Sequence, residues 1–129
     1  MQRISLPRQS TRPRITSDLV LVDGWAYVSG QAPIDFDNQK APIPELVEDQ
    51  VKKIFANLDR ILKAAGQSKD DLVSVRVAIV DLPRLYERMN AAYVMFFAPD
   101  QLPARSCVGV SHLPHGALVQ MDFVLRAKR

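Results

Sequence analysis

The sequence predicts an α+β domain, in which one mixed β-sheet carries two helices packed on one of its faces. Stretches in which apolar residues alternate with a period of two lie near both ends of the chain and in its middle. Two other stretches carry apolar residues at spacings of three and four, and each follows a predicted strand. The resulting order β-β-α-β-α-β-β has an antiparallel hairpin at each end, which is typical of such a fold.

The first predicted element is a hairpin. Residues 19–22 form its first strand, and Asp23-Gly24 is the strongest short signal for a hairpin turn. The second strand, residues 25–29, places Ser29 on the same face as two aromatic side chains. A loop rich in Pro, Asp and Asn follows this strand.

Two helices are predicted next. The first begins at Pro44 and ends before Gly66, a residue suited to the left-handed position after a helix end. Acidic residues in its first turns complement the positive end of the helix dipole. The second helix begins at Asp81 and Pro83, residue types that favour a helix start, and it ends before Pro99.

Three more strands are predicted, over residues 72–80, 104–111 and 117–126. Side chains alternate along a strand, so the second of them separates into two sets, Arg105, Cys107 and Gly109 on one face and Ser106, Val108 and Val110 on the other. The two valines are expected to face the core. Arg105 and the only cysteine then lie side by side on the opposite face.

One face of the sheet is predicted to lack helices and yet to be apolar. The residues expected there include Trp25, Tyr27, Val80, Leu118 and Val124. A patch of this kind is too apolar to leave exposed to water. We therefore expect the chain to self-associate through this face with cyclic symmetry.

Length and composition indicate one ordinary globular domain, with 129 residues of which 47% are hydrophobic. The sequence has no run of about 18 apolar residues that would indicate a membrane span. It does not open with a secretory apolar segment, and its single cysteine cannot form an internal disulfide. We therefore expect a reducing, cytoplasmic setting without a membrane partner.

The charge is concentrated in a basic N-terminal arm, residues 1–14, in front of a single domain over residues 15–129. Residues 1–17 contain four arginines and no acid, a charge of +4, which leaves −1 for the rest because the whole chain carries +3. A solvated tail, a transit peptide and a nucleic-acid-binding arm are all consistent with this composition. The nearly neutral domain argues against nucleic acid as a partner.

Few side chains in the sequence carry a recognisable chemistry. Phosphate-binding loops, dinucleotide fingerprints and paired-cysteine zinc patterns are absent from the sequence. His112 and His115 have no third metal ligand close to them in the sequence and are interpreted as loop residues. Cys107 has no neighbouring base and is interpreted as a small buried residue rather than a nucleophile.

Arg105 is the strongest candidate binding residue, and two interpretations of it are open. Its planar guanidinium matches a carboxylate in two-point geometry, and Gly109 leaves space on the same face of the strand. Alternatively it is an ordinary arginine at a strand end that reaches solvent or a neighbouring acid.

Several segments together resemble the RidA/YjgF family of small imine deaminases, whose members are also described as endoribonuclease L-PSP-like. The matching segments are Tyr27-Val28-Ser29-Gly30-Gln31-Ala32-Pro33, Asn57-Leu58, Ile61-Leu62-Lys63-Ala64-Ala65-Gly66, Asn90-Ala91-Ala92-Tyr93, Phe96-Phe97, Pro103-Ala104-Arg105-Ser106-Cys107-Val108, Leu113-Pro114 and Gly116-Ala117-Leu118-Val119. Each motif alone is weak, but together they span residues 17–126 in order.

The resemblance implies a chorismate-mutase-like fold and a homotrimer with ligand sites in the clefts between subunits. It also implies hydrolysis of reactive 2-imino or 2-enamino acids, such as 2-iminobutanoate and 2-iminopropanoate, to 2-keto acids and ammonia, without a metal or organic cofactor. By the same resemblance Arg105 holds the substrate carboxylate, the backbone of Cys107 contacts the region of the reacting nitrogen, and Ser29 and Asn90 line the pocket.

Two positions depart from the family pattern. Gln120 stands where active deaminases of the family usually carry a glutamate that positions or activates water, and Thr16 or Ser17 stands in place of a tyrosine. An amide can hold a water molecule but cannot accept a proton as a carboxylate does. Asp122, two residues further along the strand, is not interpreted as a displaced glutamate.

Three functions therefore remain open. The leading one is an imine or enamine deaminase, in which Arg105 binds the substrate and Gln120 takes part in catalysis. The alternative is a small-carboxylate-binding protein with little or no deaminase activity, because Gln120 replaces the usual glutamate. A role directed at RNA or translation is the weakest of the three because the domain is nearly neutral.

Overall fold

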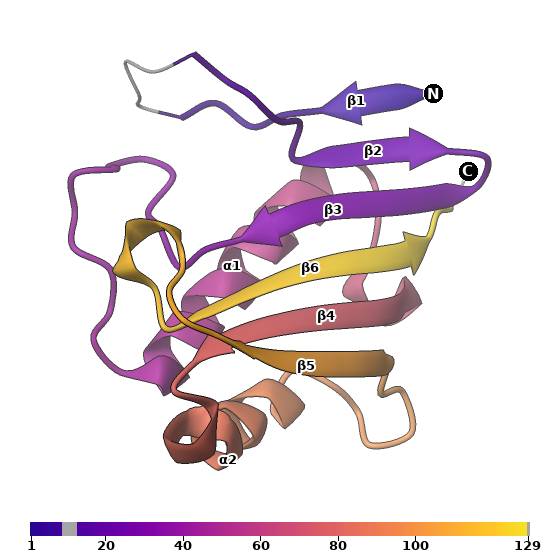
Figure 1. Cartoon of the computed structure of the whole chain (residues 1–129). Helices are drawn as coiled ribbons and strands as arrows, with labels where there is room; N and C mark the ends of the chain where they lie inside the picture. Colours follow the sequence, from indigo (N-terminus) through magenta and orange to yellow (C-terminus); the bar gives the residue numbers. More distant parts are fainter. Residues whose placement is uncertain (9–12, 129) are drawn as a thin grey trace.

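The computed structural model describes residues 1–8 and 13–128, which form one six-stranded sheet and two helices (Figure 1). The elements are β1 (Gln2–Ile4), β2 (Leu19–Val22), β3 (Trp25–Gln31), α1 (Val47–Ala64), β4 (Leu72–Val80), α2 (Leu82–Val94), β5 (Ala104–Val110) and β6 (Val119–Arg126), with short 3-10 turns at Lys69–Asp71 and Pro114–Gly116. The strand order is β1-β2-β3-β6-β4-β5, and only β4 and β5 are parallel. The predicted α+β class is confirmed.

Strand β1 lies outside the predicted elements. It pairs antiparallel with β2, with Gln2 opposite Leu21 and Ile4 opposite Leu19. Three residues are too few to show an alternating pattern in the sequence. The described part of the basic arm is therefore not a solvated tail, since its first residues extend the sheet. Arg12 of the arm lies outside the described residues.

The first predicted hairpin is confirmed as β2 and β3. Asp23 and Gly24 have φ angles of 51° and 81°, and a type I′ turn needs positive values at both positions. Strand β3 then pairs with β6, and their register shifts by one residue between Val28 and Gln31. An extra residue of this kind is a β-bulge, which bends the strand and redirects its side chains.

The core lies between the sheet and the two helices, which cover the same face (Figure 1). Its largest fully buried side chains are Phe36, Phe55, Phe123, Leu19, Ile54, Leu58, Ile61, Leu62, Ile79, Leu85, Met89 and Met121. Helix α1 begins at Val47, three residues after the predicted start at Pro44. Asp81 precedes α2 but does not cap it, because its carboxylate accepts a hydrogen bond from Arg84 Nε at 2.6 Å instead.

The prediction of which face of β5 meets the core is wrong. Arg105 and Cys107 lie opposite Val75 and Val77 of β4, whose side chains are buried under the helices. Val108 therefore points to the face without helices, and 58% of its surface is exposed. Apolarity did not distinguish the two faces because the helix-free face is apolar as well.

The face without helices, called here the open face, carries exposed apolar side chains as predicted. Tyr27 of β3 is 49% exposed and Val108 is more so, while Val124 of β6 is half-buried. A single chain leaves this surface in contact with water, which favours association with another apolar surface. Self-association stays a prediction.

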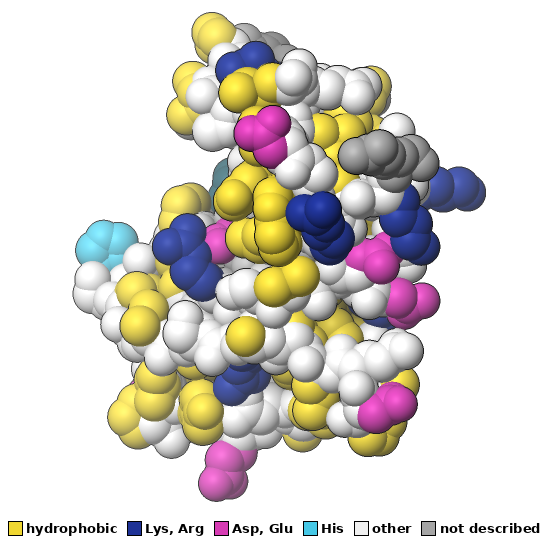
Figure 2. Space-filling view, turned by 90° about the vertical axis from the view of Figure 1, so that its right-hand side faces the viewer, with side chains coloured by type: hydrophobic (Ala, Val, Ile, Leu, Met, Phe, Trp, Pro, Cys, Tyr) yellow, Lys and Arg dark blue, Asp and Glu magenta, His cyan; other side chains and the backbone are white. Residues whose placement is uncertain are grey.

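Figure 2 views the end of the sheet that carries the β2–β3 turn. Lysine and arginine side chains lie there among acidic and hydrophobic ones, rather than in one continuous basic surface. This end of the molecule therefore lacks the one-sign charge pattern that is typical of nucleic-acid-binding surfaces.

Candidate functional site

A pocket lies beside two of the predicted site residues, at one end of the open face, and is called here the open-face pocket. Its volume is about 650 Å³. The walls are formed by the N-terminal segment, the end of β3, the loop after it, and the start of β6, and the lining residues include Arg8, Arg14, Thr16, Asp18, Ser29, Gly30, Phe36, Pro114 and Gln120. The predicted site residues Ser29 and Gln120 are therefore in one pocket.

The β-bulge in β3 positions this pair. Gly30 lies in the bulge, and the side chain of Gln120 crosses directly over it. A Cβ atom at position 30 would lie 2.7 Å from Gln120 Nε2, which is closer than two such atoms can approach. Glycine at this position therefore leaves the space that the Gln120 amide occupies.

Ser29 is tied to the N-terminal segment through both its backbone and its side chain. Its N–H donates to the carbonyl of Asp18 at 2.9 Å, and its hydroxyl donates to the carbonyl of Ser17. Of the two residues that replace the family's tyrosine, Thr16 lines the pocket and Ser17 contributes this carbonyl. The Ser29 hydroxyl thus holds the pocket wall in place.

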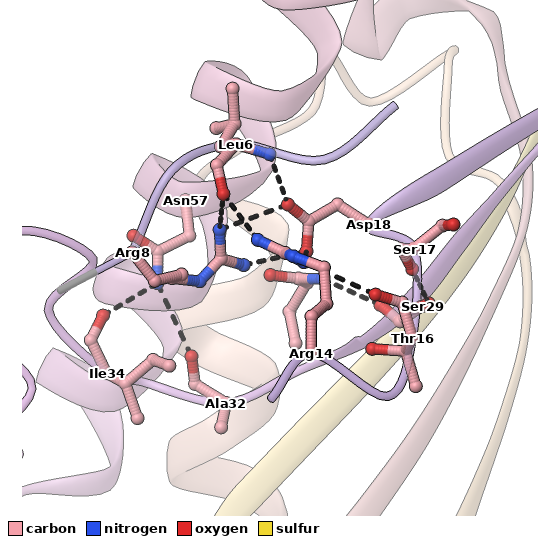
Figure 3. Close-up of polar contacts among 11 residues, drawn as sticks. Leu6, Arg8, Arg14, Thr16, Ser17, Asp18, Ser29, Ala32, Ile34 and Asn57 are labelled. Carbon is pink, nitrogen blue, oxygen red and sulfur yellow. Dashed lines mark hydrogen bonds and ion pairs between the residues drawn. The ribbon is translucent and has the colours of Figure 1, made fainter. Parts of the chain in front are cut away.

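A buried ion pair fixes the rest of this wall (Figure 3). Two nitrogens of Arg8 donate to the carboxylate of Asp18 at 2.7 and 3.0 Å, and the backbone N–H of Leu6 donates to it at 2.8 Å. Only 14% of the Arg8 side chain and 5% of the Asp18 side chain are exposed. The Arg8 guanidinium also lies 3.5 Å from the centre of the Phe36 ring.

The pairing of these charged residues could not be predicted from the sequence pattern. Their pairing joins positions 10 residues apart, and residues 13–17 belong to no helix or strand, so there is no periodicity from which to predict the contact. The one available signal is weak. Asp18 is the first acidic residue after a segment that contains four arginines and no acid.

Arg105 lies elsewhere, at the outer edge of the sheet beside α2. Its guanidinium carbon is 4.8 Å from the centre of the Tyr93 ring, and one nitrogen donates to the Tyr86 hydroxyl at 3.3 Å. Another nitrogen contacts Met89 Sδ at 3.9 Å. These contacts hold the fork against the helix in one orientation while leaving the side chain partly exposed.

Cys107 and Asn90 are on the same side of the sheet as Arg105. Burial raises the pKa of the Cys107 thiol, although the nearby Arg105 charge opposes the shift. Asn90 Oδ1 is buried and accepts no hydrogen bond from the described residues. The Tyr93 hydroxyl is in the same situation, and burial raises its pKa.

The structure therefore separates the predicted site residues into two groups within one chain. Arg105, Cys107 and Asn90 lie on the helix side, at β5 and α2. Gln120 is paired with Ala78 in register and points to the open face, together with Ser29. One chain does not bring Arg105 to Gln120, because the sheet lies between them.

The raised pKa of Cys107 leads to a reactivity prediction. At about pH 8 the folded protein should react with iodoacetamide more slowly than free cysteine does, since a raised pKa lowers the thiolate fraction. The rate should keep increasing with pH beyond 9.0, the ordinary pKa of the group. Mass spectrometry of alkylated protein measures this rate, and urea-unfolded protein is the control. A rate equal to that of the unfolded chain would contradict the prediction.

The described residues provide neither a metal site nor a membrane span. Over residues 1–8 and 13–128, no group of three or more His, Cys, Asp or Glu side chains is placed to hold a metal ion. The helices within the same residues are either too short or too polar to cross a bilayer.

Comparison with known proteins connects the two groups of residues to one family. Residues 14–126 match the family model described as Endoribonuclease L-PSP. A RutC family protein of Aquifex aeolicus is 33% identical over 125 residues, which cover 96% of this chain and 98% of that protein.

Solved structures agree with this sequence match. The Rid family protein YyfA of Yersinia pestis superposes with a TM-score of 0.87 at 29% identity, covering 98% of both chains. TdcF of Escherichia coli, solved with bound serine, superposes with a TM-score of 0.84 at 27% identity, covering 99% of this chain and 100% of that one.

Proposed function

Because the chain belongs to the endoribonuclease L-PSP family, the RidA/YjgF family that its motifs resemble, we propose that it hydrolyses 2-imino and 2-enamino acids to 2-keto acids and ammonia. The observation that carries this proposal is the Arg105 guanidinium, held in a fixed orientation against Tyr93 and Tyr86. A fork oriented in this way is suited to two-point binding of the substrate's carboxylate.

The proposed site is shared between copies of the chain in a homotrimer. One copy contributes Arg105, Cys107 and Asn90, and its neighbour contributes Ser29 and Gln120. Two observations support this arrangement. The two groups lie on opposite sides of the sheet in one chain, and the open face carries the apolar surface that a second copy would cover.

In the proposed reaction, water adds to the C2 carbon of the imine, the C–N bond then breaks, and the nitrogen leaves as ammonia. Arg105 fixes the carboxylate, and the Cys107 backbone contacts the region of the nitrogen. The Gln120 amide holds the attacking water but cannot take its proton, so the proton passes to the leaving nitrogen or to solvent. Orientation of a bound electrophile and a bound water is itself an effective form of catalysis.

The bound serine in TdcF supports a ligand of this class. Serine, like a 2-imino acid, carries a nitrogen on the carbon next to its carboxylate. We propose that this chain binds the same combination of groups, with its own residues and without a metal or organic cofactor.

Gln120 favours a second candidate function, a protein that binds small carboxylates and hydrolyses imines slowly or not at all. Loss of a general base typically lowers a rate by about 10²–10⁴-fold.

A trapping assay separates the two functions. Imines are generated from alanine and 2-aminobutyrate by an amino-acid oxidase, and semicarbazide captures what remains. Faster disappearance of 2-iminopropionate or 2-iminobutyrate than in buffer supports the deaminase, and an unchanged rate supports the binder.

The Gln120→Glu variant tests whether the side chain at position 120 activates the attacking water. The substitution preserves the length of the side chain and its position over Gly30, and it introduces a group that accepts a proton. We expect the rate of imine hydrolysis to rise by at least about tenfold, the low end of what a general base contributes. The same trapping assay measures it, with Gln101→Glu, an exposed site, as the control. An unchanged rate would mean that water is activated by another group.

A further inference from the structure

The open-face pocket contains more positive charge than the proposed reaction requires. Among the residues that the structure describes, the pocket is lined by two arginines and one aspartate, Arg8, Arg14 and Asp18, and by His115. Arg105, which we assign to the substrate's C2 carboxylate, belongs to the other group of site residues. The arginines at the pocket therefore need a different explanation.

Arg8 forms a two-point ion pair with Asp18. Two short hydrogen bonds join their charged groups, both side chains are largely buried, and the Phe36 ring covers the guanidinium. A pair of this geometry is the strongest type of charged hydrogen bond in proteins. Asp18 carries one negative charge, so it cannot balance the positive charges of two arginines.

Arg14 is that second arginine, and it is held at the pocket by different partners. Its nitrogens donate to the backbone carbonyls of Leu6 and Thr16, and the nearest Asp18 oxygen is 3.6 Å away (Figure 3). The side chain is 38% exposed. The carbonyls orient the guanidinium without cancelling its charge. Asp18 forms an ion pair with Arg14 as well as with Arg8, so the two arginines and the one carboxylate keep a net charge of +1.

We propose that Arg14 binds a second acidic group of the substrate, so that the preferred substrates are 2-imino dicarboxylic acids. This proposal rests on the proposed deaminase function. Arg105 of one copy holds the C2 carboxylate, and Arg14 of the neighbouring copy holds the carboxylate at the end of the side chain. A site with an oriented guanidinium in a cluster of net positive charge favours a ligand that carries an anion at that point.

The test compares two substrates in the wild type and in Arg14→Gln. An amino-acid oxidase generates 2-iminosuccinate from aspartate and 2-iminopropionate from alanine. In the variant, kcat/KM for 2-iminosuccinate should fall by roughly tenfold or more, because a charge-assisted hydrogen bond is lost, and kcat/KM for 2-iminopropionate should stay within about twofold. Arg84→Gln is the matched control, since it removes the same charge from an exposed position paired with Asp81.

The outcomes separate the two proposals. Hydrolysis of both imines with an unchanged ratio in Arg14→Gln would overturn the role of Arg14 and leave the deaminase intact. If the wild type hydrolyses neither imine, the deaminase fails. Calorimetry with 2-oxoglutarate and pyruvate then decides the role of Arg14. A selective loss of 2-oxoglutarate binding in the variant supports it, and unchanged or equally weakened binding of the two keto acids overturns it. Thermal unfolding of the variant shows whether the wall formed by residues 13–18 has remained folded.

Discussion

Replacing Arg105 with alanine should lower kcat/KM for 2-iminopropionate by about 100-fold, the largest effect on activity that the structure leads us to expect. A bidentate hydrogen bond to a charged group contributes about 1.5–3 kcal/mol, and the upper part of that range corresponds to this factor. The two arginines of α2 are already paired elsewhere, Arg84 with Asp81 and Arg88 with Glu48, so neither is placed to replace the lost contact. Steady-state kinetics with semicarbazide trapping measures the change.

Two variants distinguish recognition by Arg105 from simple loss of charge or packing. Arg105→Lys keeps the charge but not the planar fork, and it should recover only a small part of the activity. Arg84→Ala removes an arginine from the exposed first turn of α2 and should leave kcat/KM unchanged. If Arg105→Ala kept wild-type kinetics in a folded protein, the carboxylate would have to bind elsewhere, and the proposed site would be wrong.

Asp18→Asn should lower the free energy of unfolding by about 3 kcal/mol, because it breaks a buried ion pair by removing one partner. The substitution leaves the Arg8 guanidinium buried beside Phe36 without its counter-charge. It also weakens the hydrogen bond that the Leu6 N–H donates to the carboxylate. Urea unfolding at a fixed protein concentration measures the change, because the stability of an oligomer depends on concentration.

Asp37→Asn provides the comparison for this experiment. Asp37 also pairs with an arginine, Arg60, but 75% of the Asp37 side chain is exposed and the distance is 3.3 Å. Exposed pairs contribute about 0–1 kcal/mol, so this variant should unfold close to the wild type. If the two variants lost equal amounts of unfolding free energy, burial of the Arg8–Asp18 pair would not increase its contribution to stability.

The periodic parts of the fold were predictable from the sequence. Apolar spacing identified α1, α2 and every strand except β1, and the turn at Asp23-Gly24 was visible as a dipeptide. Periodicity could not identify β1, which is too short, nor the core side of β5, where both faces carry apolar or small residues. The side of a strand that meets a helix depends on the path of the chain, which single-strand patterns do not contain.

The candidate site was predictable only in its residue types. The motifs around Arg105, Ser29 and Gln120 are contiguous in sequence, so the sequence alone identifies them. Their separation by the sheet follows from the register of β5 and β6 against β4, which is a property of the folded chain. The Arg8–Asp18 pair and the orientation of Arg14 depend on irregular backbone and were not predictable at all.

Strand β1 affects the tendency of this protein to aggregate through the edge of its sheet. Without it, the unpaired N–H and C=O groups of β2 would form an open edge, and such edges template the addition of strands from other chains and lead to aggregation. A three-residue strand that carries the charged side chain of Arg3 makes a poor template itself. The first residues of the chain therefore protect the sheet against edge-to-edge polymerisation.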